Sequence, residues 1–439
     1  MNLLTALRVR RGDRVAFTGA GGKTSAIFQL ARQVLGPVLV TTTTHMAETQ
    51  LAAADLILRI DPSEWPALPD DLDSNKVIAV CGHPDTQGRV TGPGADQFEL
   101  ILDLQTRLNA TLLVEGDGAR GLALKAPAGH EPVVPEFVNL AVVVAGLSAI
   151  GSLLGPASVH RPEIFADLSG TVIGEPIGSD EVVRFLTHEE GGLKGLPPGA
   201  RRVILLNQSD DPKRTAIAGS MAVSLLSKYS SVIIASLQEQ IIQAVKERIG
   251  AVVLAAGESR RMGRPKQTLE WRGEPFVRWV AAAALQAGCD PVLVVLGANA
   301  EEVEQAVSGL NVRCVHNSDW AGGQSTSLRT GLNALPENCG GCLFLLADQP
   351  QIPTTLLQRL IEGHARNLAP ITAPLIDGRR GNPVLFDRVT FPDLDQLMGD
   401  AGGRQIFGRY PIDWVPWHDP TALADIDTPE DYLRMQEEI

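Results

Sequence analysis

The sequence predicts two α/β domains, each built as a three-layer α/β/α fold around a largely parallel sheet. The chain has 439 residues, more than the roughly 250–300 that one hydrophobic core usually organises. Short apolar runs rich in Val, Ile and Leu recur in both halves, as expected for strands buried on both faces of a sheet. Helical patterns separate these runs, and that alternation is typical of α/β folds.

The apolar runs place the expected strands in two series. In the first half they are residues 15–17, 38–40, 112–114, 141–144 and 231–235. In the second half they are residues 251–254, 292–296, 312–315 and 343–346, with helices expected at 277–287 and 301–307. The apolar residues of segment 237–248 have a helix-compatible spacing. We expect the boundary near Gly250, which gives a P-loop-like domain over residues 1–245 and a Rossmann-like domain over residues 250–439.

Composition excludes several classes of function. The formal net charge of −13 argues against a nucleic-acid partner, because phosphate-backbone binding depends on Lys and Arg. No run approaches the roughly 18 apolar residues of a membrane span, and the N-terminus lacks the order of a signal peptide. Five cysteines, an odd number, fit a reducing compartment. We expect a cytoplasmic protein that binds small molecules and has no membrane partner.

The second series of strands begins with a loop suited to phosphates. Leu254 ends the first strand, and the small residues Ala255, Ala256 and Gly257 follow it. Small residues let backbone N–H groups approach a triphosphate. Basic side chains then follow within seven residues, where they can neutralise it: Arg260, Arg261, Arg264 and Lys266. The alternative is a tight strand-to-helix turn with a solvated basic face.

The run LAAGESRRMGRPK, residues 254–266, resembles the signature loop of the molybdenum cofactor nucleotidyltransferases, and the similarity covers residues 250–435. Its Ala255-Ala256-Gly257 form resembles the cytidylyltransferase branch, which favours CTP. The resemblance implies magnesium-dependent transfer of CMP to the terminal phosphate of molybdopterin. Arg261 and Lys266 would then neutralise charge in the transition state.

Two acidic residues are the expected magnesium ligands of this half. Asp348 follows the strand at 343–346, and open α/β sheets gather ligands at the carboxyl ends of their strands. Mg²⁺ commonly takes one or two carboxylates plus substrate phosphates, although Asp348 could instead cap the helix after Pro353. Asp427 lies in a segment that resembles the closing motif of the family. Its alternative is an ordinary helix start capped by Thr428.

Two further segments face the substrates in the relatives that the chain resembles. Gln324 and Ser325 begin a predicted helix whose N-terminus could meet an anion, so we expect them to bind the nucleotide. Residues Gly381, Asn382 and Pro383 follow a predicted hairpin turn. We expect those three to line the site of the second substrate.

The first half carries a phosphate-binding loop after its own first strand. Gly19, Gly21 and Gly22 can cradle phosphates, Lys23 can reach the terminal ones, and the hydroxyl of Thr24 can bind magnesium. The first glycine of the usual pattern is replaced by Phe17. The shortened loop resembles that of the Mur ligases, which implies ATP. A glycine-rich turn without a ligand is the alternative.

An acidic strand end follows at Glu115 and Asp117, and of the two we favour Asp117 as a magnesium ligand. Together with the loop and with segments 41–46 and 114–135, it resembles the YqeC family over residues 5–240. Those are accessory proteins of selenium-dependent molybdenum hydroxylases, so a hydroxylase apo-enzyme is an expected partner. Four side chains could bind a ligand or be solvated: His45, Lys125, His130 and Glu131.

Both halves therefore indicate molybdenum cofactor maturation by a bifunctional enzyme. One alternative is a nucleotidyltransferase for a sugar phosphate or polyol phosphate, because this fold serves many acceptors. Another is a chaperone that binds finished cofactor and passes it to a hydroxylase. That alternative predicts cofactor binding without turnover of CTP.

Overall fold

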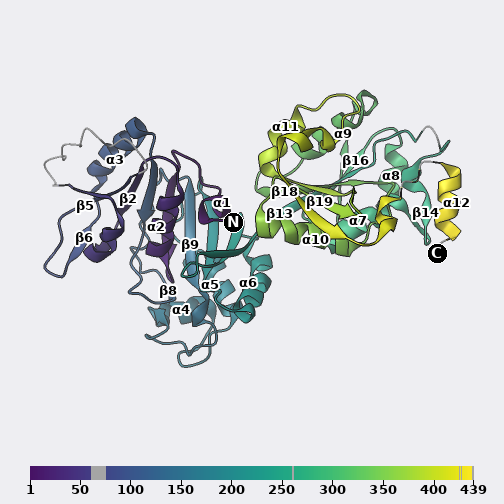
Figure 1. Cartoon of the computed structure of the whole chain (residues 1–439). Coiled ribbons are helices and arrows are strands. Elements are labelled where there is room, and N and C mark those ends of the chain that lie inside the picture. Colours follow the sequence, from purple (N-terminus) through teal and green to yellow (C-terminus); the bar gives the residue numbers. More distant parts are fainter. Residues whose placement is uncertain (61–75, 260–261, 425, 427, 438–439) are drawn as a thin grey trace. The chain divides into compact units, whose positions relative to one another are not determined.

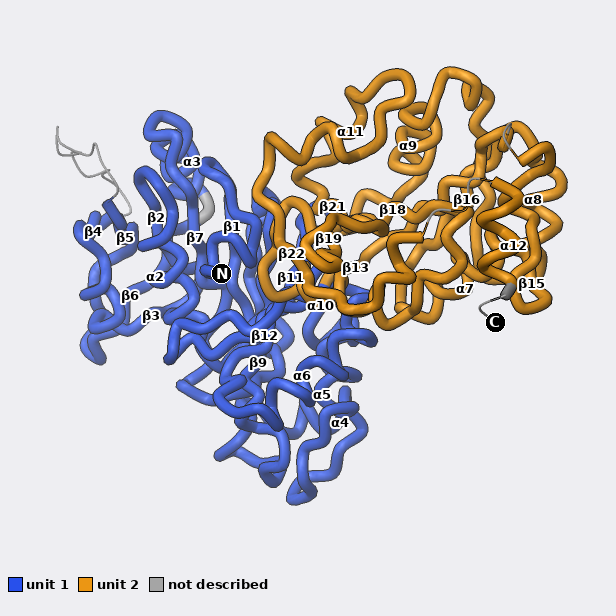
Figure 2. The backbone as a smooth tube through the Cα atoms, turned by 45° about the vertical axis from the view of Figure 1, so that its right-hand side comes forward, with its two compact units in different colours: residues 1–246 blue, residues 247–439 orange. Residues whose placement is uncertain are grey.

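The chain forms two compact units, Met1–Lys246 and Glu247–Ile439, coloured separately in Figure 2. The structure is a computed structural model that describes residues 1–60, 76–259, 262–424, 426 and 428–437. Each unit has its own hydrophobic core. Across the described ranges, every helix is too short or too polar to cross a membrane.

Unit 1 is built on a parallel sheet, and Figure 1 labels its strands β2, β5 and β9. Its strands run in the order β12-β11-β9-β1-β7-β2-β5-β4, and the pairs along this order are parallel. Strand bounds are β1 Arg14–Gly19, β2 Val38–Thr42, β4 Leu56–Arg59, β5 Val77–Cys81, β7 Thr111–Glu115, β9 Leu140–Gly146, β11 Arg201–Asn207 and β12 Ser231–Ser236. The predicted strands of this half are confirmed. Because the strands are parallel, their carboxyl ends meet at one edge, where ligands bind in such sheets.

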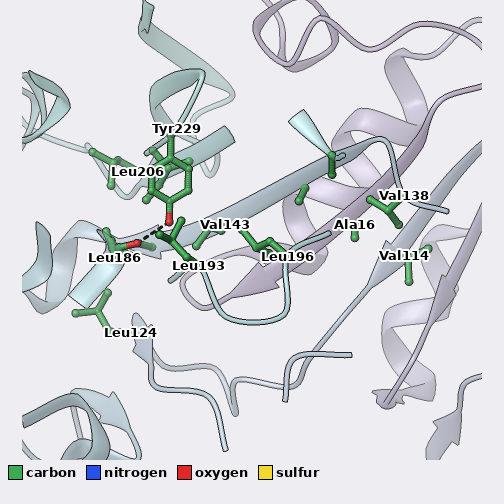
Figure 3. Packing of buried hydrophobic residues seen from close by; sticks show 14 of the residues in the cluster. Ala16, Val114, Leu124, Val138, Val143, Leu186, Leu193, Leu196, Leu206 and Tyr229 are labelled. Carbon is green, nitrogen blue, oxygen red and sulfur yellow. Dashed lines mark hydrogen bonds between the residues drawn. The ribbon is translucent and has the colours of Figure 1, made fainter. Parts of the chain in front are cut away.

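Helices and two small ladders complete unit 1. The helices are α1 Leu3–Ala6, α2 Lys23–Gln33, α3 Ala95–Leu108, α4 Pro162–Ser169, α5 Ser179–Thr187 and α6 Pro212–Leu225. The ladders are β3 His45–Ala47 with β6 Arg89–Thr91, and β8 Leu124–Lys125 with β10 Val159–His160. Figure 3 shows the core, where the buried hydroxyl of Tyr229 donates to the Leu186 carbonyl oxygen over 2.8 Å. That bond satisfies the one polar atom that this ring takes into the core.

Unit 2 has a mixed sheet in the order β17-β16-β13-β18-β21-β19-β22. Its bounds are β13 Ile241–Leu254, β16 Val292–Leu296, β17 Arg313–His316, β18 Cys339–Leu346, β19 Ile371–Ile376, β20 Arg379–Arg380, β21 Val384–Asp387 and β22 Ile412–Trp417. β14 Glu270–Trp271 and β15 Glu274–Pro275 form a separate hairpin. β21 runs antiparallel to both neighbours because the chain reverses through the β19–β20 hairpin.

The helices of unit 2 are α7 Phe276–Gln286, α8 Ala300–Ala306, α9 Gln324–Asn333, α10 Thr354–Asn367, α11 Phe391–Asp395 and α12 Pro429–Glu437. The two helices predicted in this half are confirmed as α7 and α8. A buried hydrogen bond of 2.8 Å between His364 Nε2 and Asp387 Oδ2 ties α10 to the end of β21. Pairing satisfies two polar groups that would be costly if buried alone.

The helical structure that the apolar spacing of residues 237–248 suggested is wrong. These residues turn after β12 and enter β13, which runs without interruption to Leu254. Ile241, Ile242 and Val245 are β-branched, and such side chains lose rotamer freedom in a helix and pack well in strands. Three apolar positions are too few to distinguish the 3.6-residue period of a helix from the two-residue period of a strand.

Candidate functional site

The loop between β1 and α2 depends on its glycines. Gly19, Gly21 and Gly22 have φ values of 87°, 84° and 127°, in the left-handed region that other residues rarely adopt. A Cβ on Gly21 would lie 2.5 Å from the Gly146 backbone nitrogen. α2 begins directly afterwards at Lys23. Backbone N–H groups of such a turn and the helix N-terminus form a surface suited to an anion.

Thr24 lies against Glu115 at the end of β7. Its hydroxyl donates to Glu115 Oε2 over 3.1 Å and accepts from Gln50 Nε2 over 3.1 Å. Burial raises the pKa of the Glu115 carboxyl, although the charge of Lys23 partly opposes this shift. The hydroxyl and the carboxylate are both hard oxygen donors, the type that Mg²⁺ prefers.

Asp117, which the sequence favoured as a metal ligand, instead lies between two lysines. Lys23 Nζ is 3.3 Å from its Oδ1, and Lys125 Nζ is 2.8 Å from its Oδ2. The Gly19 backbone N–H also donates to it over 3.3 Å, while Lys23 donates to the Gly19 carbonyl oxygen. Its carboxylate is thus neutralised by protein groups, and Glu115 is the strand-end acid that contacts Thr24.

The ion pairs continue from Lys125 into the loop that follows. Lys125 Nζ is 3.0 Å from Glu131 Oε2, which in turn lies 2.7 Å from Arg161 Nη1. Burial raises the pKa of Glu131, but hydrogen bonds from the two cations outweigh it and lower that pKa to about 2. Lys125 and Glu131, left open by the sequence, are therefore ion-pair partners, with Lys125 buried and Glu131 partly buried, whereas His130 is exposed.

The Glu131 shift predicts a dependence of stability on acid. Because its folded pKa lies below its ordinary 4.5, its contribution is present above about pH 4.5 and is lost as pH falls toward 2. We expect the difference in unfolding free energy between wild type and Glu131→Gln to shrink between pH 5 and pH 3. Urea unfolding at several pH values measures it. A difference that stays constant with pH would contradict the assignment.

A cavity of about 680 Å³ adjoins the phosphate loop. Its lining includes Gly21, Gly22, Lys23, Thr24, Glu115, His45, Gln50, Asn207, Gln208, Asp210, Leu237 and Gln238. Four of the predicted loop residues, Gly21, Gly22, Lys23 and Thr24, thus line one cavity, while Gly19 does not, and residues at the ends of β11 and β12 form another part of the wall. This volume lies within the range typical of small-molecule sites.

In unit 2 the loop after β13 is held by one buried amide. Gln267 Nε2 donates to the carbonyl oxygens of Ala255 and Gly257 over 3.2 and 2.7 Å. Gln267 Oε1 accepts from the Ser259 hydroxyl over 3.2 Å. A Cβ on Gly297 would lie 2.4 Å from the Ala256 carbonyl oxygen. The loop is therefore fixed in shape by its neighbours.

Lys266 and Asp348 are brought together from distant parts of the sequence. Lys266 Nζ lies 3.7 Å from Asp348 Oδ2, with the side chains 11% and 33% exposed. Asp348 does not cap α10, whose N-cap is Pro353. A partly exposed carboxylate at the end of β18 can bind a cation, and the ammonium group beside it can contact an anion.

A cavity of about 420 Å³ lies at the carboxyl ends of β13 and β18; its lining includes Gln349, the residue after Asp348, but neither Asp348 nor Lys266. Four residues predicted to bind substrate or nucleotide line it: Leu254, Gln324, Gly381 and Asn382. The lining also holds Gln349 and the cations Arg379, Arg380 and Arg404, and Arg380 lies 5.1 Å from the centre of the Phe407 ring. Such a wall suits a ligand with phosphate groups and a planar apolar part.

Other predicted residues lie apart from this cavity. Ser325 is fully buried, its N–H donates to the Gly399 carbonyl oxygen, and Pro383 is buried too. Arg261 and Asp427 lie outside the described residues. At the start of α12 the Thr428 hydroxyl donates to Asp431 Oδ2 and accepts from the Asp431 backbone N–H. These bonds form the helix start capped by Thr428 that the sequence offered as the alternative to a metal site at Asp427.

Sequence reasoning missed three residues of these sites. Gln267 follows the basic run, yet nothing in its position indicates a side chain that bonds back to the loop. Arg404 comes from a segment with no regular pattern. Asn207 follows the apolar residues Val203, Ile204, Leu205 and Leu206, which were not among the predicted strands. A polar residue at the end of such a run is the one signal that could have indicated it.

Comparison with known families gives one match in each half. Residues 15–163 match the YqeC protein family, and residues 251–414 match the MobA-like NTP transferase domain. YqeC of Escherichia coli (strain K12) is 32% identical over 211 residues, covering 45% of this chain and 77% of that protein. Nicotine blue oxidoreductase of Paenarthrobacter nicotinovorans is 32% identical over 197 residues, covering 43% and 96%. Molybdenum cofactor cytidylyltransferase of Escherichia coli (strain K12) is 27% identical over 190 residues, covering 43% and 96%.

Proposed function

Because this chain belongs to the YqeC family in its N-terminal half and to the MobA-like NTP transferases in its C-terminal half, we propose that it matures molybdenum cofactor. Unit 2 transfers CMP from CTP to the terminal phosphate of molybdopterin, releasing pyrophosphate. The observation that carries this proposal is the pairing of Lys266 with Asp348, whose neighbour in sequence, Gln349, lines the cavity that also holds the three arginines.

The chain's own residues supply positioning and charge. An oxygen of the acceptor phosphate attacks the α-phosphorus of CTP, the bond from that phosphorus to the bridging oxygen breaks, and pyrophosphate leaves with the bond electrons. The loop after β13 holds the triphosphate through its backbone N–H groups, and Lys266 offsets the developing charge. The carboxylate of Asp348 suits Mg²⁺, which would neutralise triphosphate charge when bound. Arg261 and Asp427 remain proposed members of this site.

The acceptor occupies the cavity lined by Arg379, Arg380 and Arg404. Guanidinium groups pair with phosphate in a bidentate geometry, and the Phe407 ring offers a face for a flat pterin. The relatives that match this half are named for different reactions. Their names therefore do not identify the acceptor, and substrates have to be tested.

The test is pyrophosphate release by the full chain with Mg²⁺, molybdenum-loaded molybdopterin and each of the four nucleoside triphosphates. Turnover with CTP alone supports the proposal, and preference for GTP would change the nucleotide. Turnover only when a sugar phosphate or polyol phosphate replaces the pterin would change the acceptor. Tight pterin binding without any turnover would favour a chaperone.

Replacing Arg380 by alanine tests the acceptor site separately. We expect the KM for molybdopterin to rise about tenfold or more, because charge-assisted hydrogen bonds contribute roughly 1.5–3 kcal/mol. The KM for CTP should change little. The matched control is Arg388→Ala, an exposed arginine that does not line the cavity. Equal effects of both substitutions would argue against an arginine-lined acceptor site.

For unit 1 we propose a nucleoside triphosphate whose phosphates bind at Gly19–Thr24, in support of hydroxylase maturation. Thr24 and Glu115 are the groups that suit a magnesium ion there, and Glu115 takes the place that the sequence assigned to Asp117. ATP is the nucleotide that the loop resemblance implies, and an apo-hydroxylase is the proposed partner.

A further inference from the structure

The cavity beside Lys23 extends beyond the phosphate loop to the ends of β11 and β12. Its wall there consists of Asn207, Gln208, Asp210, Leu237 and Gln238. A nucleotide whose phosphates lie at the loop would have room for its base among these residues, because they line the same cavity. The loop itself contacts phosphates and carries no information about the base, so the choice of base must come from this wall.

Asn207 connects the wall to the loop. It is 5% exposed, its Nδ2 donates to the Gly21 carbonyl oxygen over 2.6 Å, and its Oδ1 accepts from the Leu237 N–H over 2.9 Å. Gln29 Nε2, from α2, donates to the Leu237 carbonyl oxygen over 2.6 Å. These bonds fix the distance between the phosphate loop and the turn after β12, as a site for one ligand of defined length requires.

Asp210 presents an oriented carboxylate at this end of the cavity. The fully buried Ser236 donates its hydroxyl to Asp210 Oδ1 over 2.6 Å, and Arg214 Nη1 lies 3.5 Å from Oδ2. A carboxylate offers about four lone-pair sites. These two partners therefore hold the group in place and leave each oxygen able to accept one more hydrogen bond.

We propose that the cavity of unit 1 binds a guanine nucleotide, with Asp210 accepting hydrogen bonds from the guanine N1–H and from its N2 amino group. Guanine presents two adjacent donors on its pairing edge. Adenine and cytosine place an acceptor nitrogen beside their amino group, and uracil has one N–H between two carbonyls, so none of them matches a carboxylate. This inference rests on the proposed binding of phosphates at Lys23, and it replaces ATP as the expected nucleotide.

The substitution Asp210→Asn separates recognition of the base from damage to the fold. A carboxamide offers one acceptor and one donor. It therefore matches xanthine, in which a C2 carbonyl replaces the amino group beside N1–H. We expect affinity for GTP to fall about tenfold to hundredfold and affinity for XTP to rise by a similar factor, as one bidentate contact to a base would produce. A misfolded variant could not gain affinity for a new nucleotide.

The experiment measures equilibrium binding of GTP, ATP and XTP, each with Mg²⁺, to the full chain. Binding that Lys23→Ala abolishes is assigned to unit 1, which separates it from the site of unit 2. The matched control is Asp211→Asn, the same change one residue on, at the N-cap of α6 and outside the cavity wall. Its preference among nucleotides should equal that of wild type.

Preference for GTP in wild type with a switch toward XTP in Asp210→Asn supports the proposal. Preference for ATP, or an Asp210→Asn variant with an unchanged preference, would overturn the guanine assignment while leaving the phosphate loop in place. No Lys23-dependent binding of any nucleotide would overturn both the base assignment and the proposed role of the loop.

Discussion

Replacing Asp348 by alanine is expected to lower the rate of pyrophosphate release at least about a hundredfold. Asp348 follows β18, which ends at Leu346, and its Oδ2 lies 3.7 Å from Lys266 Nζ, so its loss removes the carboxylate proposed for Mg²⁺ and an ion pair of the proposed triphosphate site. A metal ion at a phosphoryl group contributes several kcal/mol to transition-state stabilisation, and each 1.36 kcal/mol is a factor of ten in rate. Steady-state turnover with saturating CTP and molybdopterin measures the effect.

Two further variants test whether the loss of activity is specific to the Asp348 carboxylate. Asp348→Asn keeps the size of the side chain and removes its charge, so it should lose most of the same activity. Glu337→Ala removes an exposed carboxylate elsewhere in unit 2 and should retain it. If Asp348→Ala turned over at a rate within threefold of wild type, the metal role of Asp348 would be wrong.

Replacing Lys125 by methionine is expected to destabilise unit 1 by about 3–5 kcal/mol. The Lys125 side chain is 1% exposed and pairs with both Asp117 and Glu131. Removing Lys125 leaves Asp117 with Lys23 and Glu131 with Arg161, so each carboxylate keeps one cation and loses the other in a medium of low dielectric. Methionine fills a similar volume, so the decrease in the free energy of unfolding reflects the lost charge and not a cavity left by a smaller side chain. Denaturant-dependent amide exchange of peptides from residues 111–160 measures it.

Lys228→Met is the matched control, because Lys228 makes an exposed pair with Glu189. Exposed pairs contribute less than about 1 kcal/mol, so this variant should unfold almost as wild type does. Equal destabilisation by the two substitutions would show that the chain of ion pairs around Asp117 contributes nothing beyond an ordinary surface contact.

Much of the fold was predictable because strands buried on both faces have a simple signature. The apolar runs at residues 15–17, 112–114 and 251–254 lie within β1, β7 and β13. Segment 237–248 failed because three apolar positions fit a helix while β-branched side chains favour a strand. The antiparallel direction of β21 depends on a hairpin, which hydrophobic runs alone do not encode.

The candidate sites were predictable where their residues lie close together in the sequence, and less predictable where the residues come from distant segments. The glycines and Lys23 stand together in one loop, and Asp348 follows its strand directly. Which strand-end acid contacts Thr24 depends on the direction of side chains, and Lys125 decides it by pairing with Asp117 from another segment. The Gln267 amide and the Arg404 guanidinium reach their sites from segments without a recognisable pattern, so only the folded chain identifies them.

The burial of Lys23 also bears on how binding should respond to ionic strength. The residue is 5% exposed, and its ammonium group already contacts Asp117 and the Gly19 carbonyl oxygen. A phosphate that binds here as proposed would therefore take the place of partners inside the protein, and would not displace counterions from a hydrated cation. Mobile ions screen buried pairs much less than exposed ones. Added salt should thus weaken phosphate binding here less than it would at a loop with a solvated lysine, and the affinity should hold over a wide range of salt concentrations.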